Sequence, residues 1–409
     1  MLVDVFPTAK VTTRNVAAEV PPKEAGLSTD DVAAIWRRAE ALYASGLHPA
    51  IAVCVRRRGH VVIDRAIGHA RGNAPGDPPY APKTPATPDT RFTLFSVSKA
   101  ITAMMIHLLD QEGTLHIDDP VEEYIPEFGQ RGKHWITLRH VVTHRAGIPS
   151  LPQRRIDLDL LARPEAIVEQ LCRVKPVLPP GRRLAYHALT GGWVLGEVVR
   201  RTTGQDIRAL LRNRVLAPLG FDHLNYGVPA DEIDTVAENA FTGPPVPPPF
   251  SLLLRRALGV SFADAVRHSN DPRYLTAIIP SGNVAGTANE VSRFFQLLLD
   301  RGVLDGVRIF EPRTIRRALA EHAYFEIDLT LAVPIRYGLG FILGAEWLSL
   351  YGRHTPRAFG HLGFSNVLAY ADPERDISVA ILTSGKPFLS PRLSRLYSLV
   401  QCIADRCRR

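Results

Sequence analysis

A serine and a lysine three residues apart give this chain a candidate nucleophile and base. Ser96-Val97-Ser98-Lys99 follows an extended-looking run and opens a mainly apolar segment. On a helical turn, residues three apart share a face, so the Ser96 hydroxyl and the Lys99 amine can meet. A serine hydroxyl is a poor nucleophile until a base takes its proton, and a lysine can be that base only where burial or a nearby cation lowers its pKa. The apolar continuation supplies such burial, and a helix start supplies N–H groups for a developing oxyanion.

Two later segments give this short motif a context. Pro180-Gly181 leads through Arg182-Arg183-Leu184-Ala185 to Tyr186-His187-Ala188, ahead of a glycine-containing helical pattern over 189–203. Further on, Phe359-Gly360-His361-Leu362-Gly363-Phe364 has the composition of a strand, in which Gly363 permits close approach of the backbone to an acyl group. An S-x-x-K match alone is weak evidence, so the interpretation rests on the three segments together.

In this order the three segments resemble the motifs of one family, which includes class C β-lactamases, D-Ala-D-Ala peptidases and family VIII carboxylesterases. The resemblance extends over residues 27–400, with further matches at 115–124, 136–149, 280–299 and 337–341. It implies that Tyr186 shares the proton transfer with Lys99. It also implies that the N–H groups of Phe364 and Ser96 form the oxyanion hole. The implied catalytic residues are Ser96, Lys99 and Tyr186, and the implied oxyanion and substrate-binding residues are Ser96, His361, Gly363 and Phe364.

Two positions depart from the β-lactam-binding pattern of that family. Ala188 stands where the family has an asparagine that binds the amide side chain, and His361 stands where many members have a lysine that pairs with a carboxylate. Both departures favour an ester substrate. We therefore predict a serine hydrolase that forms an acyl-enzyme at Ser96, of the carboxylesterase or lipase-like kind. The alternatives are a β-lactamase or D-amino-acid peptidase, a transesterase, and a catalytically silent binding or assembly protein.

Each candidate residue also has a purely structural interpretation. Ser96 and Lys99 could be a surface cap and a solvated lysine, Tyr186 a core tyrosine, and His361 a structural histidine. We assign His144 to structure rather than catalysis, and the sequence leaves open whether His187 faces the cleft or the helices.

Composition excludes several other classes of protein. The chain has 409 residues, 45% hydrophobic and 22% charged, which is typical of a globular protein. Its net charge of +8 is spread over short basic clusters, so we expect no nucleic-acid partner. G-x-S-x-G, H-E-x-x-H and Walker sequences are absent, and the four cysteines have no metal-site spacing. We expect no cofactor or metal, a small-molecule ester as partner and, without a signal-peptide pattern or a long apolar run, a cytoplasmic location.

Strand patterns at both ends of the chain and helical patterns between them predict an α+β fold. We expect one antiparallel sheet built from both termini and flanked by helices, with a helical subdomain inserted. The expected parts are an N-terminal extension (1–26), a sheet subdomain (27–95 and 275–409) and a mainly helical subdomain (96–274). Residues 250–268 are interpreted as two packed helices, or alternatively as a lid or acyl-pocket wall. The expected helices include 27–48, 98–111, 164–173, 189–203, 206–216, 289–299, 312–320 and 391–407, and the expected strands are 50–55, 61–66, 337–344, 358–360, 367–372 and 377–384.

Overall fold

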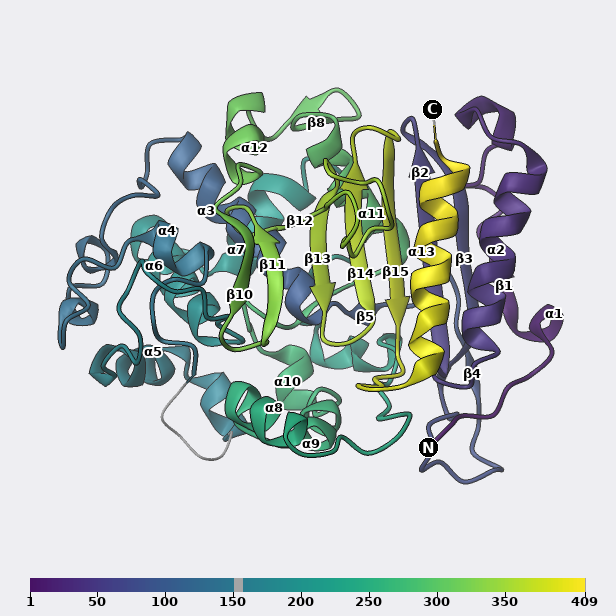
Figure 1. The fold of residues 1–409 in the computed structure, drawn as a ribbon, viewed down its shortest axis with the longest axis horizontal. Helices are drawn as coiled ribbons and strands as arrows, with labels where there is room; N and C mark the ends of the chain where they lie inside the picture. The colour runs from purple at the N-terminus through teal and green to yellow at the C-terminus, as the bar shows by residue number, and fades with distance from the viewer. Residues whose placement is uncertain (151–156, 409) are drawn as a thin grey trace.

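A long antiparallel sheet is the central element of the computed structural model, which describes residues 1–150 and 157–408 (Figure 1). Strands from the two ends of the chain meet inside it, because β15 from the C-terminal part pairs with β2 from the N-terminal part. In order across the sheet, the strands are β1 (Thr12–Arg14), β3 (His60–Arg71), β2 (Ala50–Arg57), β15 (Ile377–Thr383), β14 (Val367–Asp372), β13 (Phe359–Gly363), β12 (Ile342–Leu343), β11 (Val333–Tyr337) and β10 (Ala323–Asp328), with β4 (Thr84–Pro85) paired to β3. Two smaller sheets contain β5 (Phe92–Thr93), β7 (Val284–Gly286) and β6 (Asn225–Tyr226), and β8 (Val303–Leu304) and β9 (Val307–Arg308).

Helices cover both faces of the sheet, which explains why its central strands are apolar throughout. Along β2, Ala50, Ala52 and Cys54 belong to one hydrophobic core, while Ile51 and Val53 belong to another. Helices α2 (Thr29–Tyr43) and α13 (Ser394–Arg406) pack together in the second core, and α11 (Ala288–Leu299) covers the opposite face. Successive strand residues point to opposite faces, so both sets must be hydrophobic.

Helices and loops fill the middle of the chain. The short helix α1 (Thr8–Val11) precedes the sheet. The central helices are α3 (Ser98–Gln111), α4 (Leu138–Val142), α5 (Pro164–Arg173), α6 (Thr190–Thr203), α7 (Ile207–Leu211), α8 (Phe250–Leu258), α9 (Phe262–His268) and α10 (Pro272–Thr276), and α12 (Pro312–Ala318) follows α11. Figure 1 shows α8 and α9 beneath the β10–β11 hairpin, away from α2 and β1.

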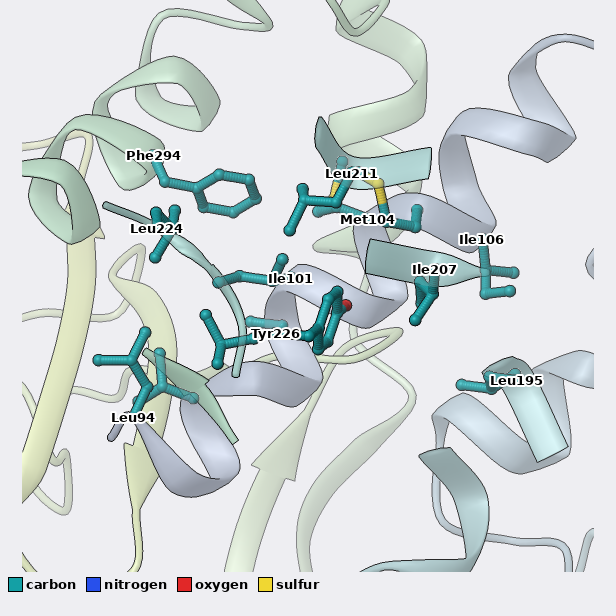
Figure 2. Close-up of a cluster of buried hydrophobic side chains, with 14 of the residues drawn as sticks. Leu94, Ile101, Met104, Ile106, Leu195, Ile207, Leu211, Leu224, Tyr226 and Phe294 are labelled. Carbon is teal, nitrogen blue, oxygen red and sulfur yellow. The ribbon is translucent and has the colours of Figure 1, made fainter. Parts of the chain in front are cut away.

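Helix α3 carries the candidate lysine and is buried from Ser98 to Leu109. Its apolar side chains Ile101 and Met104 lie in the core cluster that also contains Leu211, Tyr226 and Phe294, from surrounding elements (Figure 2). A helix buried on most sides has little freedom to shift, so the residues at its N-terminus are held firmly.

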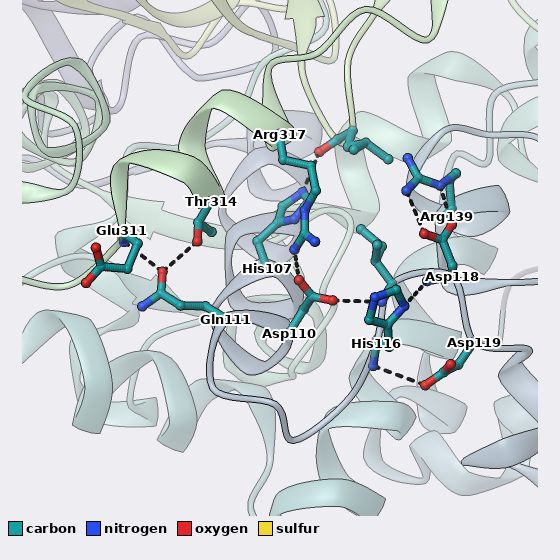
Figure 3. Close-up of polar contacts among 12 residues, drawn as sticks. His107, Asp110, Gln111, His116, Asp118, Asp119, Arg139, Glu311, Thr314 and Arg317 are labelled. Atoms are coloured by element: carbon teal, nitrogen blue, oxygen red, sulfur yellow. Dashed lines mark hydrogen bonds and ion pairs between the residues drawn. The ribbon is translucent and has the colours of Figure 1, made fainter.

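Polar contacts fix the other end of α3 (Figure 3). Asp110 forms an ion pair with Arg317 of α12 and accepts a hydrogen bond from the N–H of Ile117. The amide oxygen of Gln111 accepts bonds from the Glu311 N–H at 2.7 Å and the Thr314 hydroxyl at 2.8 Å. These contacts tie α3 to α12 and to the loop after α3.

Most of the expected elements are present. Ser28 caps α2 in a capping box with Asp31, and the antiparallel sheet with strands from both ends of the chain is confirmed. Residues 250–268 form two helices, α8 and α9.

The structure also differs from expectation. The hairpin β10–β11 was not predicted, since its burial does not alternate and a register irregularity interrupts it between Ala323 and Glu326. The single strand predicted over 337–344 is wrong. The chain turns at Gly338–Gly340 between β11 and β12, and Gly340 has a φ of +99°. Within the first 26 residues, β1 pairs with β3 at the edge of the sheet.

Candidate active site

Ser96 and Lys99 lie next to each other at the start of α3. Ser96 is in the 3-10 helix η2 (Phe95–Val97), which runs directly into α3. The Lys99 Nζ lies 3.1 Å from the Ser96 Oγ. Ser96 is half-buried and lines a large cavity, whereas Lys99 is 8% exposed. The hydroxyl is therefore open to a ligand while the amine is withdrawn behind it.

Two backbone carbonyls complete the surroundings of the Lys99 amine. Its Nζ donates to the carbonyl of Ala188 at 2.8 Å and to that of Ser281 at 3.0 Å. Burial lowers the pKa of Lys99 to about 7. A neutral amine has two N–H bonds and one lone pair, so these carbonyls take both N–H bonds and leave the lone pair for the Ser96 hydroxyl. The arrangement suits an amine that accepts the serine proton.

Tyr186 lies on the other side of the same amine. The Lys99 Nζ is 4.8 Å from the centre of its ring. Burial raises the pKa of Tyr186 well above its usual value, and its hydrogen bond with Ser96 offsets this only in part. The phenol therefore keeps its proton near neutral pH. Asp328 holds the backbone beneath it, because its Oδ1 accepts the Tyr186 N–H at 3.1 Å.

His361 projects from β13 beside Tyr186 and is buried. The two ring centres are 6.4 Å apart. Burial, followed by the nearby Lys99, lowers the pKa of His361 to about 3, so its ring is neutral. Its Nδ1 lies 2.9 Å from the Leu362 carbonyl, which can only accept, so Nδ1 carries the proton and Nε2 is left as an acceptor.

Gly363 and Phe364 bring the end of β13 against the chain that enters η2. A Cβ at Gly363 would lie 2.1 Å from the Leu94 carbonyl oxygen, so only glycine fits. Phe95 and Phe364 both have positive φ, 48° and 47°, and their rings stack 5.0 Å apart. The ring of Phe262 in α9 stacks on Phe364 at 4.6 Å. The close approach at Gly363, the positive φ of Phe95 and Phe364 and the ring stack together fix the backbone of both segments.

Two further histidines lie behind the site. His144 contacts the Tyr186 ring at 4.6 Å between centres, and its Nδ1 accepts the His187 N–H at 3.2 Å. His187 is fully buried and faces the helices, where it lines a cavity of about 20 Å³ with Lys99 and Thr102. His187 therefore does not line the large cavity.

The large cavity has a volume of about 1280 Å³. Ser96, Tyr186 and His361 line it among mostly apolar side chains, including Leu254 and Phe262. These last two come from α8 and α9, so residues 250–268 are both a pair of helices and a wall of the cavity.

The structure adds two site residues that the sequence did not single out. Ser281 contributes only its carbonyl, and a backbone group has no signature of its own. Asp328 accepts the N–H groups of Thr330 and Leu331 as well as that of Tyr186. An aspartate that bonds the N–H two residues on is an Asx-turn, but the sequence gives no sign that the third donor comes from Tyr186.

A family model described as Beta-lactamase matches residues 37–401, nearly the whole chain. The chain belongs to the beta-lactamase family. The family is one of serine hydrolases with this fold. This chain is 30% identical over 312 residues to a curated relative, the "Esterase/beta-lactamase LipL" of Mycobacterium tuberculosis. The match covers 73% of this chain and 70% of the relative. The chain is 23% identical over 381 residues to a "Putative D-alanyl-D-alanine carboxypeptidase" of Salmonella agona, covering 85% and 82%.

Two solved structures have the same fold as this chain. A penicillin-binding protein homologue from Caulobacter crescentus superposes with a TM-score of 0.78 at 29% identity, covering 93% of this chain and 99% of that one. A structure titled as a family VIII carboxylesterase gives the same TM-score and coverage at 26% identity.

The described ranges, 1–150 and 157–408, contain neither a metal site nor a disulfide. No group of three or more His, Cys, Asp or Glu side chains there could hold a metal ion. All four cysteines fall within these ranges and are free, including Cys402 and Cys407. No helix in the described part is long and apolar enough to cross a membrane.

Proposed function

We propose that this protein hydrolyses carboxylic esters through an acyl-enzyme at Ser96. One observation carries the proposal: a desolvated amine, Lys99, lies 3.1 Å from a serine hydroxyl that opens into a large apolar cavity. The amine can take the hydroxyl proton, and the cavity can hold the ester against the hydroxyl.

In the acylation step, the Ser96 Oγ attacks the ester carbonyl carbon while its proton passes to Lys99. The N–H groups of Ser96 and Phe364 stabilise the oxyanion. Tyr186, which is protonated at rest, gives its proton to the leaving alkoxide and regains one from Lys99. The bond from the carbonyl carbon to the alkoxy oxygen breaks, so an alcohol leaves and an acyl-serine remains.

In the deacylation step, water attacks the acyl-serine through the same oxyanion site. The Lys99–Tyr186 pair takes a proton from the water and returns one to the Ser96 Oγ. The carboxylic acid leaves and the enzyme is restored. Each turnover consumes one ester and one water and releases one acid and one alcohol.

The walls of the site favour an ester over a β-lactam or a D-amino-acid peptide. Ala188 presents a methyl group where an asparagine would bind an amide, and its carbonyl is engaged by Lys99. His361 is buried and neutral, so it provides no positive charge for a substrate carboxylate. Of the similar proteins, LipL is named both an esterase and a beta-lactamase, and one of the solved structures is a family VIII carboxylesterase.

A fluorophosphonate probe tests the nucleophile. We expect the probe to label the wild-type protein and not Ser96→Ala, because phosphonylation needs the activated hydroxyl. Ser98→Ala is the matched control, since the Ser98 hydroxyl accepts the Val284 N–H at 3.0 Å and faces away from the reaction. Absence of labelling in the wild type would favour a silent binding protein.

Substrate competition tests the reaction class. We expect p-nitrophenyl esters to be hydrolysed faster than nitrocefin or a D-Ala-D-Ala peptide, measured as kcat/KM. Faster turnover of nitrocefin or of the peptide would assign the protein to β-lactamases or D-amino-acid peptidases. Transfer of the acyl group to an added alcohol in preference to water would assign it to transesterases.

A further inference from the structure

At the mouth, where the large cavity opens to solvent, several of its lining side chains are apolar and exposed. Five residues both line the cavity and are at least 40% exposed, and we call them the apolar rim. They are Leu252 (67%), Val333 (45%), Leu348 (64%), Leu350 (40%) and Tyr397 (41%). A hydrophobic patch of this kind on a protein surface marks an interaction site.

The rim is assembled from segments far apart in the sequence. Leu252 comes from α8, Val333 from β11, Tyr397 from α13, and Leu348 and Leu350 from the loop between β12 and β13. Figure 1 shows α8 below the β10–β11 hairpin and α13 across the sheet from it. The exposed apolar surface therefore comes from four separate segments rather than from one element.

Two more exposed apolar residues extend the rim outward. Trp347 is 71% exposed next to Leu348. Phe250 is 44% exposed, and its ring centre lies 6.1 Å from that of Phe388, which lines the cavity. Tryptophan is the side chain that best fits the boundary between water and lipid, because its large ring is apolar and its N–H is polar.

We propose that the apolar rim docks on the surface of a lipid aggregate, from which the protein draws esters of long acyl chains into the cavity. This inference rests on the esterase function proposed above. The rim is continuous with the apolar lining that leads to Ser96, so a chain leaving a lipid layer stays in contact with apolar surface all the way to the nucleophile. A protein partner on the rim would instead close the entrance.

The size and charge of the site agree with this occupant. The cavity of about 1280 Å³ exceeds the roughly 300–1,000 Å³ typical of small-molecule sites, and so has room for a long chain. Arg255, exposed at the mouth, and the net charge of +8 favour an anionic lipid surface. Glu346, the acidic neighbour of Trp347, is already paired with His354.

Vesicle binding tests docking independently of catalysis. The full-length Ser96→Ala protein would be mixed with vesicles of equal parts phosphatidylcholine and phosphatidylglycerol, and with phosphatidylcholine alone. We expect flotation with the vesicles, stronger with the anionic mixture, and a blue shift of tryptophan emission that Trp347→Phe removes. Trp347→Ser and Phe250→Ser should each weaken binding about tenfold, because each removes a large apolar side chain from the contact.

Val16→Ser and Tyr80→Ser are the matched controls. Val16 is 71% exposed and Tyr80 is 88% exposed, so both present large side chains to solvent. They lie near β1 and β4, at the end of the sheet opposite β10. These variants should bind vesicles like the parent. Equal loss of binding in rim and control variants would overturn the proposal. So would a wild-type dimer in sedimentation that Trp347→Ser dissociates, because the rim would then be a contact between two copies.

Turnover separates this inference from the esterase proposal. For Trp347→Ser and Phe250→Ser, we expect the ratio of p-nitrophenyl palmitate hydrolysis in vesicles to p-nitrophenyl butyrate hydrolysis in solution to fall about tenfold. An unchanged ratio would contradict docking while leaving the esterase intact. Vesicle binding without hydrolysis of either ester would contradict the esterase and leave docking standing.

Discussion

A lysine is an unusual base, and its surroundings decide whether it can act as one. Lys99 is removed from water, which disfavours its charged form, and it has two carbonyl acceptors but no carboxylate among its hydrogen-bond partners in the described part of the chain. Tyr186 is also buried, which favours its neutral form. The same desolvation thus prepares one group to accept a proton and the other to donate one.

The pKa of Lys99 predicts the pH dependence of acylation. Because Lys99 must be unprotonated to act, kcat/KM for a soluble ester should rise about tenfold per pH unit below pH ~7 and level off above it. Lys99→Arg, which stays charged, should lower kcat/KM by about 10²–10⁴-fold. Tyr186→Phe should lower the high-pH plateau of kcat/KM but keep the inflection of the pH profile near 7. An inflection that moves in Tyr186→Phe would assign it to the coupled pair instead of to Lys99.

Asp328 holds the backbone of Tyr186 in place, and its charge adds to the rise in the pKa of that phenol. Asp328→Ala leaves three N–H groups without their acceptor, so we expect kcat to fall and the free energy of unfolding to drop by about 1–3 kcal/mol. Asp328→Asn keeps a carbonyl oxygen and should restore most of both. Failure of asparagine to rescue would mean that the charge, not the acceptor, is required.

At the scale of elements, the site forms where η2, β13 and the segment before α6 converge. Gly363 permits contact between β13 and Leu94, and Gly340 permits contact between the β11–β12 turn and α3, where a Cβ would lie 2.2 Å from that of Ala103. The Phe95–Phe364–Phe262 stack then connects η2, β13 and α9. Close backbone approach, rather than any single hydrogen bond, sets the distance between the Ser96 hydroxyl and the proposed oxyanion donor at Phe364.

Gly363→Ala tests this dependence on close approach. The added methyl must push β13 away from Leu94, and a displacement near 1 Å at the oxyanion hole should lower kcat/KM about 100-fold. Gly76→Ala is the control, since a Cβ there meets no atom within 4 Å and should change nothing. Wild-type activity in Gly363→Ala would show that the oxyanion donors lie elsewhere.

Sequence motifs predicted the elements of this site better than the contacts between them. S-x-x-K on an apolar segment predicted a helix that brings Ser96 and Lys99 together, and the structure does so. The aromatic stack was not predicted, because Phe262 lies far from Phe364 in the chain and no local pattern links them. The β10–β11 hairpin was missed because an edge hairpin with exposed side chains lacks the alternation that identifies a half-buried strand.

At the scale of the whole molecule, the interior holds two further lysines, Lys133 and Lys386, and the second of these resembles Lys99. Lys386 is fully buried just after β15, with its Nζ 2.5 Å from the Thr383 carbonyl and 4.8 Å from the centre of the Phe95 ring. Burial lowers its pKa to about 7, as it does for Lys99. Both cations therefore oppose folding at neutral and acidic pH.

The sign of this effect predicts how stability depends on pH. A lysine that titrates near 7 when folded and near 10.5 when unfolded penalises the native state fully below pH 7, and the penalty fades as pH rises towards 10.5. Each such lysine adds about 1.4 kcal/mol to the free energy of unfolding per pH unit in that window. Lys386→Met should therefore raise stability most at low pH and flatten the rise, as urea unfolding at several pH values would show. Lys23→Met, at an exposed lysine, should leave the pH dependence unchanged.

The position of β15 has a consequence for how the protein is made. This strand pairs with β2 from Ile377↔Arg57 to Thr383↔Ile51, yet it is synthesised more than three hundred residues later. While the ribosome is still synthesising the middle helices, the β2–β3 hairpin lacks its neighbouring strand β15. A nascent chain therefore holds Ser96 long before β13 is synthesised, and a chain released too early would carry the proposed nucleophile without the strand that faces it.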